Sequence, residues 1–84
     1  MNIATKIKDL YGFTGMAALY KLSEPLDGFE YVVVSAATVF GRDETYTFGS
    51  NENGEVQDWL ELPGSVNGVC DHEVALNNAG YEVE

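Results

Sequence analysis

The sequence predicts one small α+β domain spanning residues 1–84, in which a four-stranded antiparallel meander carries a C-terminal helix packed on one face. Alternating apolar segments separated by turn residues predict the strands, and an amphipathic segment with capping residues predicts the helix. The chain has 84 residues, of which 45% are hydrophobic and 12% aromatic. These proportions are too high for a disordered acidic tail and indicate a folded domain.

The N-terminal segment predicts a short helix. Its apolar side chains recur at helix-like spacing, at Ile3, Ile7, Leu10 and Tyr11. Gly12 and Gly15 follow at once and limit the length of this helix.

Three strands follow, each bounded by turn residues. Residues 16–22 alternate, and residues 29–39 are dense in β-branched side chains and apolar on both faces, which is typical of a central strand. Residues 44–49 alternate again, with Tyr46 and Phe48 on one face. The segment SEPLDG (23–28) and a turn around Gly41 separate them.

The pair Asn53-Gly54 predicts a hairpin that leads into a fourth strand, because both residues tolerate the positive φ of a type I′ turn. A two-residue loop places Phe48 opposite Trp59, and a four-residue loop places Tyr46 there instead. Either register adds Trp59 to the aromatic face. A short helix through Val56 and Trp59 is the alternative, but Pro63-Gly64 would end it at once, so the strand is preferred.

The C-terminal segment predicts the helix. Asp71 is a candidate N-cap and Gly80 a candidate C′ residue. The buried stripe between them comprises Val74, Ala75, Leu76 and Ala79. Tyr81 and Val83 then predict a short edge strand.

The net charge of −10 lies entirely in the second half of the chain. Residues 1–42 hold four acidic and four basic side chains, whereas residues 43–84 hold ten acids and no Lys or Arg. This distribution disfavours direct binding to nucleic acid or to an anionic membrane, because both need clustered basic residues. A basic protein partner is electrostatically favoured.

The single Cys70 and single His72 do not indicate catalysis. Neighbours in sequence rarely supply nucleophile-and-base geometry, so Cys70 is interpreted as a small core residue and His72 as an exposed residue of the first helical turn. NENGE resembles part of a calcium loop, but the ligand positions counted from Gly54 fall on Gly49 and Leu60. We therefore expect no enzyme activity, no metal site and no cofactor. A hard-cation site on carboxylates such as Asp43, Glu44 and Asp58 is the alternative to a solvated acidic surface, which is preferred.

The absence of a disulfide framework and of a signal-peptide pattern favours a cytoplasmic protein.

Trp59 and the acids around it form the candidate partner-binding site. As a buried core aromatic, Trp59 would leave the acids as a solvated face; as an interface residue, it would make them part of a recognition surface. The candidate residues are Glu44, Glu52, Glu55, Asp58, Trp59 and Glu61.

Four stretches resemble small acidic proteins encoded by actinobacterial phages, mycobacteriophages among them, and by related prophages. These stretches are ETYTFGSNENGEVQDWLELPGS, DHEVALNNAGYEVE, YGFTG and EPLDGFEYVVVSA. The resemblance implies an accessory protein acting inside a bacterial host cell and brings no assigned activity. Leu60 and Val69-Cys70 stand where that group tends to have glycines, which weakens any functional use of Cys70.

The sequence thus predicts a non-enzymatic interaction protein whose acidic second half binds a basic surface of a host or phage protein. In its sharper form, this protein mimics the charge of a nucleic acid. The alternative is a small structural or self-assembling protein, either oligomeric or associated with a virion, in which apolar faces drive association.

Overall fold

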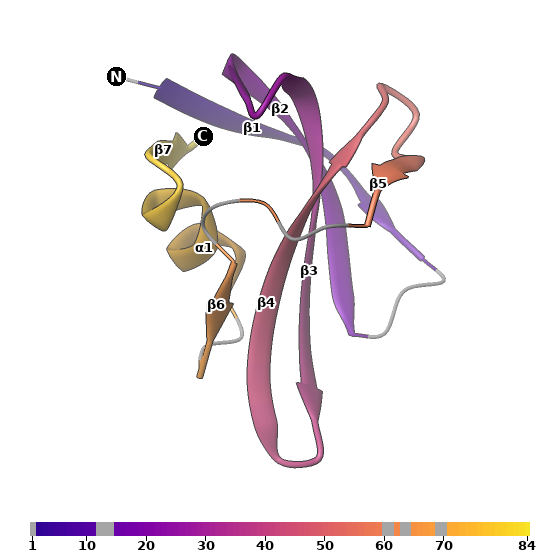
Figure 1. Ribbon diagram of the computed structural model, residues 1–84, viewed down its shortest axis with the longest axis vertical. Helices are drawn as coiled ribbons and strands as arrows, with labels where there is room; N and C mark the ends of the chain where they lie inside the picture. The colour runs from indigo at the N-terminus through magenta and orange to yellow at the C-terminus, as the bar shows by residue number, and fades with distance from the viewer. Residues whose placement is uncertain (1, 12–14, 60–61, 63–64, 69–70) are drawn as a thin grey trace.

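A computed structural model describes residues 2–11, 15–59, 62, 65–68 and 71–84. Figure 1 shows a strongly curled β-sheet with one short helix beside it. The elements are β1 (Asn2–Leu10), β2 (Met16–Leu26), β3 (Phe29–Val39), β4 (Arg42–Ser50), β5 (Val56–Asp58), β6 (Val66–Asn67), α1 (His72–Asn78) and β7 (Tyr81–Val83). The strand order is β5-β4-β3-β2-β1-β7. Both β5 and β6 pair with the same edge of β4: β5 pairs near its C-terminal end and β6 near its N-terminal end.

The predicted α+β fold, a four-stranded meander with a C-terminal helix, is wrong. The strands β1 to β4 pair antiparallel in chain order, but the sheet continues to β5 at one edge and to β7 at the other. Because β7 pairs parallel with β1, the sheet is mixed. Sequence patterns miss this pairing because it joins the two ends of the chain, and nothing local specifies it.

The predicted N-terminal helix is also wrong, since these residues form β1. The register against β2 shifts between Lys6 and Lys8, which indicates a β-bulge at Ile7. The bulge reverses the face on which later side chains lie, so Ala4 packs in one core cluster and Leu10 against the other. The helix-like spacing of apolar residues therefore arises from a bulged strand.

The described side chains form a buried cluster on each face of the sheet. The larger lies under α1 and comprises Ala4, Ala18, Tyr20, Leu22, Val32, Val34, Leu62, Ala75, Leu76 and Tyr81. The smaller, on the opposite face, comprises Ala17, Leu19 and Val33, with Leu10, Tyr31 and Val56 packed against it. The prediction that the central strand β3 is covered on both faces is confirmed, because Val32, Val33 and Val34 are all buried.

The sheet curls so far that its two ends approach each other. A methyl group placed on Gly54, in the turn between β4 and β5, would lie 3.0 Å from a methyl carbon of Leu10 at the end of β1. Leu10 and Val56 accordingly share the smaller cluster. Although β5 and β6 pair with the same edge of β4, the curl of the sheet places β5 to the right of the upper part of β4 in Figure 1 and β6 and α1 to the left of its lower part.

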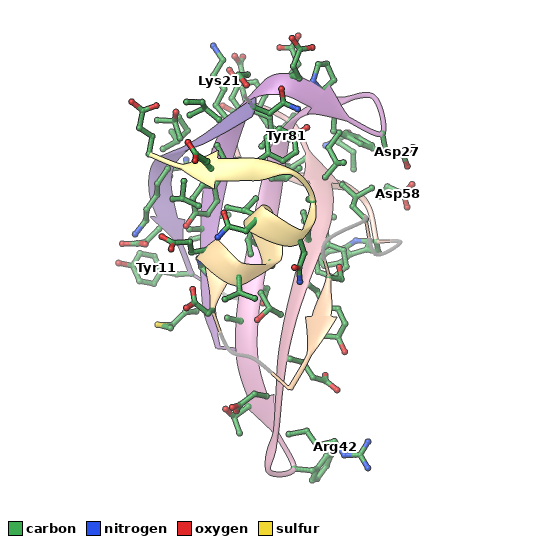
Figure 2. All side chains as sticks on the ribbon, turned by 90° about the vertical axis from the view of Figure 1, so that its left-hand side faces the viewer. Tyr11, Lys21, Asp27, Arg42, Asp58 and Tyr81 are labelled. Atoms are coloured by element: carbon green, nitrogen blue, oxygen red, sulfur yellow. The ribbon has the colours of Figure 1, made fainter. Side chains whose placement is uncertain are left out.

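The predicted C-terminal helix forms as α1, and its capping residues are confirmed. The Asp71 side chain accepts a hydrogen bond from the Glu73 N–H at 2.9 Å, and Gly80 has a φ of 99° after the last turn. The Asp71 N–H donates to the Thr45 hydroxyl at 3.2 Å, which ties the start of the helix to β4. Figure 2 shows α1 and β7 in front of the sheet.

Candidate functional site

A row of aromatic side chains runs along β4 on the face opposite α1. Tyr46 and Phe48 alternate on one side of the strand, with ring centroids 6.2 Å apart and planes inclined by 29°. The Phe48 ring then meets the Trp59 ring edge to face, with centroids 5.2 Å apart. At the other end, the Tyr46 hydroxyl donates to Glu44 Oε2 at 2.6 Å. In order, the row therefore comprises Glu44, Tyr46, Phe48 and Trp59. We call these four side chains the aromatic row.

Trp59 lies at the exposed end of this row. Its side chain is 65% exposed, so the interpretation of Trp59 as a buried core residue is wrong. Tyr46 and Phe48 are half-buried because their other sides pack against the sheet. The row thus presents aromatic surface to solvent. An exposed Trp side chain is typical of protein interaction sites.

The hairpin register agrees with the placement of Phe48 opposite Trp59, although the loop is longer than two residues. Ser50 pairs with Val56, and Gly49 pairs with Asp58 across a register shift. The loop between the strands is built on Asn51, whose Oδ1 accepts hydrogen bonds from the Asn53 and Glu55 N–H groups, each at 3.0 Å. Asn53-Gly54 is the more visible turn signal in the sequence, but the side chain of Asn51, which was not predicted to matter, organises the turn.

Glu52 and Glu55 lie in this turn, which follows the end of β4 where Phe48 meets Trp59. Both are exposed, and the Asn51 side-chain amide donates to Glu55 Oε1 at 3.1 Å, which orients the Glu55 carboxylate. This arrangement places two carboxylates at the same end of β4 as Trp59.

The remaining candidate residues are dispersed. Glu44 lies at the far end of the row from the turn, because six residue steps of extended strand, roughly 20 Å, separate it from Ser50. Asp58 pairs with Gly49, so it lies on the face opposite Phe48 and Trp59. Glu61 falls outside the described residues. The structure therefore brings together Glu52, Glu55 and Trp59, with Glu44 at the opposite end of the row.

The segment that carries this site is acidic in sequence. The sequence has no Lys or Arg after Arg42, so β5 and the turn before it contribute only acids. Lys6 and Asp9, both on β1, form an ion pair at 2.6 Å. Among charged side chains, the segment after Arg42 therefore contributes only acidic ones to the site.

His72 is occupied by structural contacts rather than exposed as predicted. Its Nε2 lies 2.9 Å from the Met16 carbonyl oxygen, which can only accept, so Nε2–H donates. Its Nδ1 then accepts from the Tyr20 hydroxyl at 3.2 Å in the neutral imidazole. Both nitrogens are engaged, so His72 joins α1 to β2. Cys70 lies outside the described residues.

Within the part of the chain that the structure describes, no three His, Cys, Asp or Glu side chains converge as a metal site would require. The same part contains no helix with the length and apolar character needed to span a membrane. Comparisons with protein-family models, with curated protein sequences and with solved structures find no match for this chain.

Proposed function

We propose that this protein is a non-enzymatic interaction module that binds a basic surface of another protein through the aromatic row and the Glu52–Glu55 turn. The observation that carries the proposal is Trp59, which is 65% exposed while its ring packs on Phe48, at the end of β4 that leads into the turn with the exposed Glu52 and Glu55. An exposed Trp held by a neighbouring ring is pre-oriented, so binding costs little side-chain entropy.

Arginine is the side chain that this surface suits best. A guanidinium can stack on an aromatic face while its N–H groups pair with a carboxylate. The aromatic row supplies the faces, and Glu52, Glu55 and Glu44 supply carboxylates at its two ends. Lysine would gain the charge attraction but less of the stacking, so an arginine-rich partner should bind more tightly than a lysine-rich one.

The resemblance to phage-encoded proteins suggests a setting for this binding. The partner would be a basic host or phage protein in the bacterial cytoplasm, and blocking its nucleic-acid-binding surface would make this protein a charge mimic of a nucleic acid. A protein that binds phosphates carries clustered Arg and Lys, which is the chemistry that this surface attracts.

Intrinsic fluorescence tests the proposal directly, because Trp59 is the single tryptophan of the chain. Titration with an arginine-rich peptide should change the emission of Trp59, and an equally charged lysine-rich peptide should bind more weakly. The double variant Glu52→Gln, Glu55→Gln should lose about tenfold or more in affinity and show a shallower dependence on salt.

The matched control is Glu24→Gln, Glu82→Gln, which removes the same charge from exposed positions on β2 and β7. If both double variants lose affinity equally, net charge alone drives binding and the proposed site is wrong.

A further inference from the structure

We draw no further inference here: the strongest candidate, the cavity that Leu10, Tyr11 and Met16 line between the end of β1 and the start of α1, carries no proposal because nothing in the structure shows what covers it.

Discussion

Two threonines on the buried face of β4 differ in what their hydroxyl groups contact. Thr45 and Thr47 are both 0% exposed. The Thr45 hydroxyl accepts a hydrogen bond from the Asp71 N–H, whereas the Thr47 hydroxyl has no partner among the described residues. A buried hydroxyl without a partner costs free energy because it has lost its hydrogen bonds to water.

Replacing each threonine with valine should therefore give opposite results. Thr47→Val should leave the free energy of unfolding unchanged or raise it by about 1 kcal/mol, because the orphaned hydroxyl is removed. Thr45→Val should lower it by about 1–2 kcal/mol, because the Asp71 N–H at the start of α1 loses its acceptor. Urea unfolding of the two variants checks this, and equal effects would show that the assigned contacts do not control stability.

The buried tyrosines predict a loss of stability at high pH. Burial raises the pKa of Tyr20 above its ordinary value of 10.0, and burial likewise raises the pKa of Tyr81. Above pH 10, the unfolded chain releases these protons first, so the folded state binds more protons and stability falls as pH rises. Below pH 10, both states keep the protons and the pKa shifts have no effect.

The expected measurement is thermal unfolding between about pH 8 and pH 11, the range in which tyrosine ionises. The melting temperature should fall above pH 10, and Tyr20→Phe should make that fall shallower although it loses the hydrogen bond to His72. A fall of identical steepness in the variant would exclude Tyr20 as a cause.

Among the elements, those predicted correctly have a local cause. The N-cap Asp71 and the glycine after the last turn define α1, and the alternation of Tyr46 and Phe48 defines the exposed side of β4. The prediction of a helix at β1 is wrong because a bulge in this strand gives its apolar residues a spacing that resembles that of a helix. The parallel pairing of β7 with β1 depends on residues almost a chain length apart, so no local pattern reports it.

The candidate site was likewise only partly predictable. The aromatic row could be predicted from the alternation of residues along the strand and from the hairpin register. The separation of Glu44 from Glu52 could not, because it depends on the residue at which the turn begins. Phe40, which is fully exposed and has a φ of 51°, and the cavity at Met16 were missed. Phe40 could have been noticed in the sequence, because it precedes Gly41 in a predicted turn where Asn or Asp is the preferred residue.

Asn51 should control the turn that carries Glu52 and Glu55. Asn51→Ala removes the acceptor of two backbone N–H groups and should lower the free energy of unfolding by about 1–2 kcal/mol. Asn51→Asp keeps that acceptor and should retain most of the stability. Thermal unfolding compares the two, and equal losses would mean that the side-chain oxygen does not hold the turn.

For the whole molecule, the position of the charge matters more than its total. The first 42 residues are neutral and supply β1, β2 and β3, which carry most of the larger core cluster. The acids of the second half are divided between the turn beside Trp59, the far end of β4, β5, α1 and the C-terminal strand. Charge alone would therefore attract a basic partner to several places, and in the proposed function the aromatic row would select one of them.

The most direct test is an NMR titration of the ¹⁵N-labelled chain with an arginine-rich peptide. We expect amide shifts to concentrate on β4, the Asn51–Glu55 turn and Trp59, including the indole N–H, and we expect α1 and β7 to change little. Shifts that instead spread over every acidic segment, or that concentrate on α1, would contradict a binding site at the aromatic row.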